Sequence, residues 1–432
     1  MNRPVPITGA QARAALDKAV EQVRLNLPRY TKKCQHHSSV NGVYPACKNE
    51  EWTCGFWPGE IWLAYERTHD EAFRRAGLAL VDSFDRRIRR RVKVAHHDMG
   101  FLYTPSCVAA YKLTGDEKAR QAAILAAGQL VSRYQPKGEF IQAWGRMGSP
   151  ENYRFIIDCL LNLPLLYWAS RETGEEKYAD IAKRHTATCM ANSFRPDGST
   201  YHTFYMRKDG RPGHGRTCQG YRDDSFWARG QAWGVYGSIL SYRYTGDPKA
   251  LDTFKRALEF YLTRLPEDLV PCWDMLFQPD SGEPRDSSSA AIVACGLLEA
   301  ARSPRGRAAS MRGWPGRWRA AWRRTTPFPS LWRARASSST AHTAKRVPIT
   351  PAFPRGWTSA PPGATSITWR PSPACARTGT PTGKGAVWED IMIRTGGADG
   401  WPPGCRTGSR PPMCACWCGG GRRCRRAGIC CG

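Results

Sequence analysis

The sequence predicts an all-α fold, an (α/α)6 toroid in which six helical hairpins close into a ring. Three observations support this prediction. Residues 8–302 show helical periodicity and no convincing strand. A short turn motif recurs four times between helices. The helix before each turn is strongly apolar and the helix after it is amphipathic and charged, so buried inner helices alternate with outer helices.

The recurring motif places a threonine before a glycine and an acidic residue. Its copies are YERTHD from Tyr65, YKLTGD from Tyr111, WASRETGE from Trp168 and YRYTGD from Tyr242. The glycine can adopt the left-handed conformation that ends a helix, and His69 takes its place in the first copy. The acidic residue can cap the next helix and interacts favourably with its positive end.

Ten of the twelve helices of a closed ring can be counted. They are an outer helix at Gln11–Leu27, four hairpins around the turns, and an inner helix at Ser287–Ala301. The hairpins have inner helices such as Phe155–Trp168 and Trp227–Tyr244, and outer helices such as Glu117–Arg133 and Pro248–Arg264. We therefore expect a toroid that is incomplete at the C-terminus. One outer and one inner helix would follow residue 302.

Composition divides the chain into a catalytic barrel domain, 1–302, and a tail, 303–432. The tail holds 20 Arg and 2 Lys against three acidic residues, so it carries +19 of the net charge of +27. This Arg-, Pro-, Cys- and Trp-rich tail is expected to be disordered and to come from a shifted reading frame. A basic tail can bind nucleic acid, but it shows no recognition motif, and we expect no nucleic-acid partner.

The chain has no run of 18 apolar residues and no apolar signal core at its start, so we expect a cytoplasmic protein without a membrane partner. The nine cysteines of the barrel are scattered, as is typical of reduced thiols. The tail cluster Cys414–Cys418 lacks a paired CxxC, and no metal is expected there.

The long loops at 87–97, 134–154, 191–224 and 265–285 run from outer to inner helices and therefore gather on one rim. Loops on a rigid scaffold often carry the functional site. Aromatic residues alternate there with single polar residues, a pattern typical of sugar pockets. The N-termini of the inner helices at the same rim favour an anionic ligand.

Two carboxylates are the candidate catalytic pair. Asp158 lies in an apolar stretch, which should raise its pKa and suit it to be a general acid, and Asp98 is the natural second carboxylate. Asn162, four residues after Asp158, is expected on the same helical face. The alternative is that Asp158 and Asn162 only satisfy each other or a backbone group.

Arg229 and Trp233 share a helical face, where Arg229 can hold a carboxylate and Trp233 can stack on a sugar ring. The alternative for Arg229 is a buried structural role. His97 and His202 have no paired carboxylate at ligand spacing, so we expect no metal. Ser287–Ser289 are interpreted first as an N-cap cluster and only second as ligand contacts.

Five segments in order over about 250 residues resemble the unsaturated glucuronyl hydrolases, a family with the six-hairpin fold. They are WTCGFWPG from Trp52, HDMGF from His97, IDCLLNLPLLYWAS from Ile157, QGYRDDSFWARGQAWGVYG from Gln219 and DSSSAAIVACGLLE from Asp286. The resemblance implies that Asp158 is the general acid and base and Asp98 the second catalytic carboxylate. It implies a substrate pocket lined by Trp52, His97, His202, Gln219, Arg229 and Trp233.

The implied reaction is hydration of the C4=C5 double bond of an unsaturated glucuronic acid on a lyase-generated oligosaccharide, without cofactor or metal. An unsaturated rhamnogalacturonyl hydrolase and a non-catalytic sugar-binding toroid are the alternatives. The resemblance also predicts a last inner helix that reads Gly-Asp-aromatic-x-Leu-Glu-Ala-Leu. Residues 363–372 can encode this pattern in a shifted frame, so we expect weak or no activity from the chain as written.

Overall fold

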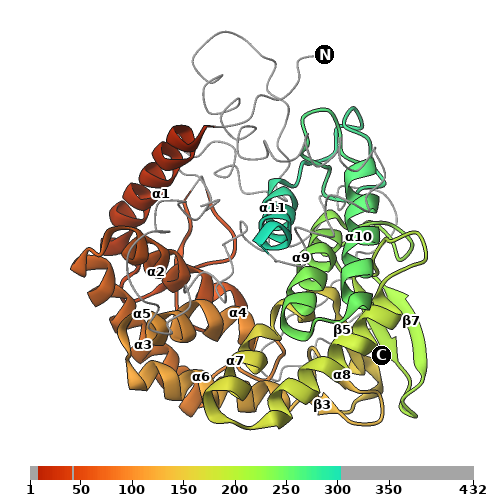
Figure 1. Cartoon of the computed structure of the whole chain (residues 1–432), viewed down its shortest axis with the longest axis horizontal. Coiled ribbons are helices and arrows are strands. Elements are labelled where there is room, and N and C mark those ends of the chain that lie inside the picture. The colour runs from red at the N-terminus through yellow and green to blue at the C-terminus, as the bar shows by residue number, and fades with distance from the viewer. Residues whose placement is uncertain (1–7, 41–42, 303–432) are drawn as a thin grey trace, which may run out of the picture.

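The computed structural model describes residues 8–40 and 43–302, and in this range the helices follow one another around a ring from α1 to α11 (Figure 1). The tail 303–432, and with it the expected disorder, the shifted frame and the helices that would complete the ring, lies outside the described residues. No described helix is both long and apolar enough to cross a membrane.

Inner and outer helices alternate as predicted. The outer helices are α1 (Gly9–Tyr30), α3 (Glu71–Arg89), α6 (Glu117–Val131), α8 (Glu176–Ser193) and α10 (Pro248–Thr263). The inner ones are α2 (Phe56–Thr68), α7 (Pro164–Thr173), α9 (Ala228–Thr245), α11 (Ser287–Arg302) and one composite helix. The composite helix consists of α4 (Met99–Tyr103), the π-helical turn η2 (Thr104–Val108) and α5 (Ala109–Thr114). Their burial differs accordingly, because α9 is buried on almost every side whereas α10 buries one face.

The four short turns have the predicted local chemistry. Left-handed backbone ends the inner helix before each of these four turns, at His69, Gly115, Gly174 and Gly246. The side chains of Asp70, Asp116 and Asp247 then accept a backbone N–H of the following outer helix. Glu175 is the exception, since it occupies the N-cap of α8 without a side-chain hydrogen bond.

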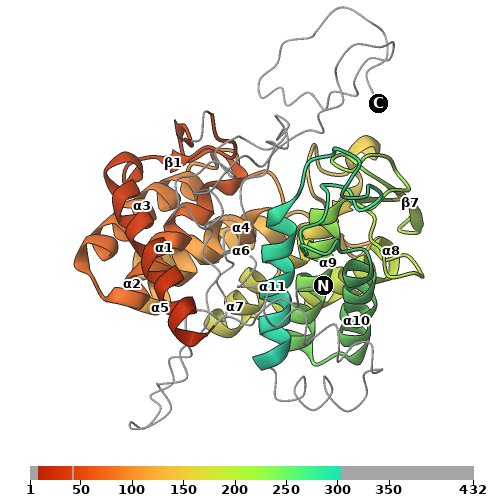
Figure 2. The ribbon, with the colours of Figure 1, turned by 90° about the horizontal axis from the view of Figure 1, so that it is seen from above.

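The prediction of no strands is wrong in the long loops. These loops form two hairpins, β1 (Cys34–Gln35) with β2 (Ala46–Cys47) and β3 (Tyr134–Gln135) with β4 (Phe140–Ile141), and a sheet of β5 (Arg154–Ile156), β6 (Thr203–Met206) and β7 (Pro212–Arg216). Strands of two to five residues are too short to show a period of two, so the sequence pattern did not reveal them. Figure 2 shows β1 and β7 toward the same end of the ring of helices.

The predicted inner helix Phe155–Trp168 is also wrong in part. Its first residues belong to β5, residues Ile157–Leu161 form the 3-10 turn η4, and the α-helix begins only at Pro164. Proline is tolerated in the first turn of a helix but disrupts its interior, which explains the late start. Asp158 therefore lies in a tight turn that leads into α7, and not within a regular helix.

One close backbone contact holds this turn against α4. A Cβ atom on Gly100 would lie 2.3 Å from Asn162 Cα and 2.5 Å from its carbonyl oxygen. A hydrogen bond stabilises the same contact, because Asn162 Oδ1 accepts the backbone N–H of Phe101 at 2.9 Å. Only glycine allows this approach, so Gly100 fixes the distance between the segments that carry Asp98 and Asp158.

Gly100→Ala is expected to lower the free energy of unfolding by about 1–3 kcal/mol, because a methyl group there overlaps backbone that cannot move aside. Gly128→Ala is the matched control, since a Cβ at Gly128 in α6 meets nothing within 4 Å. That change should raise stability by about 0.5–1 kcal/mol. Urea unfolding followed by circular dichroism measures both, and equal stabilities would contradict the proposed contact.

Candidate active site

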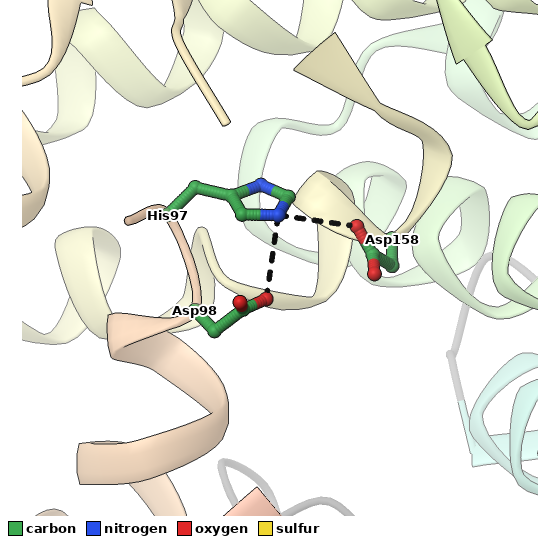
Figure 3. Close-up of side chains that lie close together, drawn as sticks. All are labelled: His97, Asp98 and Asp158. Carbon is green, nitrogen blue, oxygen red and sulfur yellow. Dashed lines mark ion pairs between the residues drawn. The ribbon is translucent and has the colours of Figure 1, made fainter. Parts of the chain in front are cut away.

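His97, Asp98 and Asp158 form a cluster at the rim (Figure 3). His97 Nε2 lies 3.3 Å from Asp98 Oδ1 and 3.6 Å from Asp158 Oδ1. The side chains of His97 and Asp98 are only 1% and 2% exposed, whereas that of Asp158 is 16% exposed. Asp158 is therefore the member of the cluster that a ligand can reach.

Three rim segments are hydrogen-bonded into one unit around this cluster. The backbone N–H of His97 donates to Ala143 O at 3.0 Å, and Ala143 N–H donates to Arg154 O at 2.9 Å. Arg154 begins β5, the strand that leads directly to Asp158. Because Asp98 is the neighbour of His97, these two hydrogen bonds couple the loops that carry the two carboxylates.

The two carboxyl groups differ in their proton affinity. Burial raises the pKa of Asp158 well above its ordinary value, and the charge of Asp98 raises it further. Burial also acts on Asp98, but the interactions with His97, His96 and Asn162 outweigh it, so the pKa of Asp98 is lowered. The pKa values of the two carboxyl groups are thus shifted in opposite directions, and Asp158 is the one that binds a proton more tightly.

His96, which the sequence analysis did not select, supports the second carboxylate. Its Nε2–H donates to Lys93 O at 3.0 Å, so Nδ1 is free to accept the backbone N–H of Asp98 at 3.1 Å. The ring stacks on Trp144, with centroids 4.7 Å apart. The sequence signal for His96 was its position directly before His97 and Asp98. Sequence spacing alone could not show whether it belongs to the site or is a histidine buried for structural reasons.

His202 lies beside the cluster because of strand pairing. Its carbonyl oxygen accepts the N–H of Ile157 at 3.0 Å, which continues the β5–β6 ladder to the residue before Asp158. Its Nδ1 accepts the backbone N–H groups of Cys218 and Gln219 at 2.9 and 3.0 Å. Burial lowers the pKa of His202 to about 3, so the ring is neutral and carries its proton on Nε2.

Arg229 is connected to His202 through an aromatic ring. The His202 ring packs on Trp227 with centroids 4.4 Å apart, and the Arg229 guanidinium lies 5.7 Å from the centroid of the same indole. Arg229 stands in the first turn of α9, and its side chain is 7% exposed. Gln219 reaches this group through its backbone N–H to His202.

The two predicted tryptophans contact the same phenylalanine. Phe101 lies edge-on to Trp52 and to Trp233, with centroids 5.6 and 5.5 Å apart. Trp52 begins η1 (Trp52–Gly55) and is half-buried, whereas Trp233 in α9 is 3% exposed. The predicted residues thus lie in three groups, two of which centre on Phe101 and Trp227, residues that the sequence analysis included in motifs but did not select.

Comparison with known proteins assigns the chain to a family. Residues 27–306 match Glycosyl Hydrolase Family 88. The chain belongs to this family. The predicted resemblance and the toroid fold are therefore confirmed.

Several named proteins are similar to this family 88 chain. It is 49% identical over 294 residues to an unsaturated chondroitin disaccharide hydrolase of Streptococcus pneumoniae, covering 68% of this chain and 74% of the relative. It is 44% identical over 289 residues to an unsaturated glucuronyl hydrolase of Bacillus sp. (strain GL1), covering 66% and 77%. The crystal structure of an unsaturated glucuronyl hydrolase from Streptococcus agalactiae superposes with a TM-score of 0.71 at 40% identity, covering 80% and 85%.

The carboxylate cluster of this family 88 chain also has the donor types of a cation site. His97, Asp98 and Asp158 each offer one ligand atom, and these three atoms lie within 4.8 Å of one another. Among the described residues, this is the group of His, Cys, Asp or Glu side chains that lies close enough together to hold a metal ion. Imidazole and carboxylate groups bind several divalent metals. The same spacing equally suits a proton shared between carboxyl groups, so the two chemistries have to be separated by experiment.

Proposed function

We propose that this chain is a glycoside hydrolase that releases unsaturated (4,5-ene) glucuronic acid from lyase-generated oligosaccharides, with Asp158 as the acid that starts the reaction. The observation that carries the proposal is the geometry of the cluster, in which the partly exposed Asp158 and the buried Asp98 both contact His97, with the pKa of Asp158 raised and that of Asp98 lowered. The names of the relatives, which are unsaturated chondroitin disaccharide and unsaturated glucuronyl hydrolases, support the same reaction class.

The chemistry begins at the double bond of the sugar. Asp158 gives its proton to C4, and the positive charge that forms is shared between C5 and the ring oxygen. Water adds at C5 and returns a proton to the Asp158 carboxylate. The resulting hemiketal opens, and the bond to the neighbouring sugar then breaks. Protonating a carbon atom needs an acid of raised pKa close to that carbon, which matches the position of Asp158.

Asp98 keeps the proton on its neighbour. Its negative charge raises the pKa of Asp158, and its own burial leaves little contact with a ligand. It also stabilises the positive charge that develops on the sugar during protonation. His97 stands between the two carboxyl groups, where burial lowers its pKa to about 4 and the charge of Asp98 acts in the opposite direction.

The remaining residues bind the unsaturated uronate. Arg229 holds the sugar carboxylate, and the neutral His202 offers Nε2–H to a sugar oxygen. Gln219 contributes to the same group, and the indole rings of Trp52 and Trp233 line the apolar side of the pocket around Phe101. Every group in this set is suited to an acidic sugar, so the roles predicted for these residues form one consistent proposal.

The first substrate to test is an unsaturated chondroitin disaccharide. Relatives at 46–49% identity carry this substrate in their names, and one solved relative was crystallised with dGlcA-GalNAc6S. Pectin-derived unsaturated products test the rhamnogalacturonyl alternative in the same assay. We also propose a cytoplasmic location, which the nine free thiols of the described residues support.

Asp158→Asn is expected to reduce kcat by about 100- to 10,000-fold, because an amide cannot donate the proton. The measurement is the loss of the ultraviolet absorbance of the C4=C5 double bond. Glu66→Gln is the matched control, since burial raises the pKa of Glu66 to about 8 although it lies in the last turn of α2, opposite the rim. Equal losses in both variants would argue against a specific role for Asp158.

The assay should compare the chain as written with a version whose reading frame is restored after residue 302. We expect activity in the restored version and weak or no activity in the chain as written. Activity in the chain as written would show that the proposed frame error is wrong. If neither version acts on any unsaturated saccharide and Asp158→Asn still binds them, the non-catalytic toroid is the better proposal.

Activity should depend on pH in a bell shape. A lowered pKa of Asp98 means that its charge is lost only in acid, so the acidic limb reports Asp98. A raised pKa of Asp158 means that its proton is lost as the pH rises, so the alkaline limb reports Asp158. Asp98→Asn should move the alkaline limb to lower pH, because it removes the charge that holds the proton. An unmoved alkaline limb would contradict the coupling.

Chelation separates proton transfer from metal chemistry at the cluster. Dialysis against EDTA is expected to leave kcat unchanged, because the proposed steps use only protons and water. The control is a zinc hydrolase treated in the same buffer, which must lose activity. Loss of activity here, with recovery on adding one divalent metal, would assign the cluster of His97, Asp98 and Asp158 to a cation instead.

A further inference from the structure

Arg229 faces an acidic residue on the neighbouring inner helix. Its Nε lies 3.5 Å from Asp286 Oδ2, and the two side chains are 7% and 0% exposed. Arg229 is in the first turn of α9, and Asp286 directly precedes α11. The pair therefore joins the N-termini of two inner helices, which Figure 1 shows side by side.

The two oxygens of Asp286 have different partners. Oδ1 accepts the backbone N–H groups of Ser288 and Ser289 at 2.9 and 3.1 Å, and the Ser288 hydroxyl at 2.5 Å. Asp286 thus caps α11, whereas the sequence analysis assigned the cap to Ser287–Ser289, which form the first turn of the helix. Oδ2 is buried, has no hydrogen-bond partner among the described residues, and faces Arg229.

The backbone around Asp286 is rigidly held. Its N–H donates to Pro271 O at 2.8 Å, and its carbonyl oxygen accepts the hydroxyl of Ser289 at 2.8 Å. The Ser289 hydroxyl also contacts Tyr261 OH at 3.2 Å. Cap and backbone bonds leave the carboxylate little freedom, so Oδ2 is a fixed negative point beside the guanidinium.

A cap alone does not require this charge. Asparagine and serine cap helices as well as aspartate does. A fully buried carboxylate, in contrast, is costly unless a cation balances it, and a nearly buried guanidinium has the same need. The charge of Asp286 is therefore explained by Arg229 and not by α11.

We propose that Asp286 is a positioning residue that orients Arg229 and balances its charge, so that the guanidinium can take the carboxylate of the substrate. This inference rests on the proposed function of Arg229. The Nε edge of Arg229 faces Asp286, and a guanidinium carries five N–H donors, so an arginine that faces one carboxylate can bind a second one. Trp227, with its ring beside both Arg229 and His202, holds the guanidinium on the side of the pocket.

Asp286→Asn separates the two tasks of this side chain. The amide oxygen can still accept the N–H groups of Ser288 and Ser289, whereas the charge facing Arg229 is lost. We expect a Tm lowered by several degrees, because the buried guanidinium loses its counter-charge, together with an increase in KM of about 10- to 100-fold and a smaller change in kcat in the folded protein. Ser288→Ala is the matched control, because it removes one bond to Oδ1 and leaves the charge, and its KM should not change.

A substrate with a methylated carboxyl group tests the mechanism of the effect. The ester has no charge for Arg229 to hold, so Asp286→Asn should alter its KM far less than that of the free acid. Arg229→Lys combined with Asp286→Asn should cost little more than either change alone, because both act on one contact. An unchanged KM in Asp286→Asn, or an equal effect on acid and ester, would overturn the proposal.

Failure of the proposed function gives a different result. In that case the restored protein shows no turnover, and calorimetry detects no binding of the unsaturated disaccharide to Asp158→Asn. If Asp158→Asn does bind it, the double variant Asp158→Asn/Asp286→Asn should bind about 10- to 100-fold more weakly. Turnover together with an unaffected KM in Asp286→Asn rejects only the positioning role.

Discussion

The site depends on one interaction, which is the unfavourable effect of the charge of one carboxyl group on the ionisation of a second one in the same cluster. Asp98 is the more enclosed of the two and keeps its charge through His97, His96 and Asn162. The pKa of Asp158, which is partly exposed, is raised by burial and by the charge of Asp98. The rest of the rim serves to hold this distance, and Gly100 with Asn162 sets it through a contact that no side chain larger than hydrogen permits.

The fold makes such a contact possible by the order of its elements. Short capped turns fix the inner helices at one end, and the longer loops at the other end pair into small sheets that bring distant segments together. The bond from Ile157 to His202 is one such case, since it places a proposed binding residue beside the proposed acid across 45 positions of sequence. Rigid helices and paired loops together position the site, and the proposed reaction uses no cofactor.

Part of the fold and of the site could be predicted from the sequence, because the interactions that form it lie between residues close together in the chain. A glycine after an apolar helix predicts a left-handed cap, and an apolar stretch around Asp158 predicts a retained proton, although the stretch proved to be a strand and a 3-10 turn. The strands and the roles of His96 and Asp286 could not be predicted in this way. Their partners, Asp98 and Arg229, are known only once the ring has brought distant segments together, and short pairings leave no periodic signal.

The pairing of Arg229 with Asp286 also bears on the acid. The carboxylate of an unsaturated uronate is attached to C5, next to the carbon that receives the proton, so its binding group must stand near Asp158. An uncompensated guanidinium there would lower the pKa of Asp158 and remove the proton that the reaction needs. Asp286 balances that charge from behind the pocket, and His202 adds a donor without adding charge. A site that holds an anion beside a protonated acid thus needs its cation partly neutralised, which this arrangement provides.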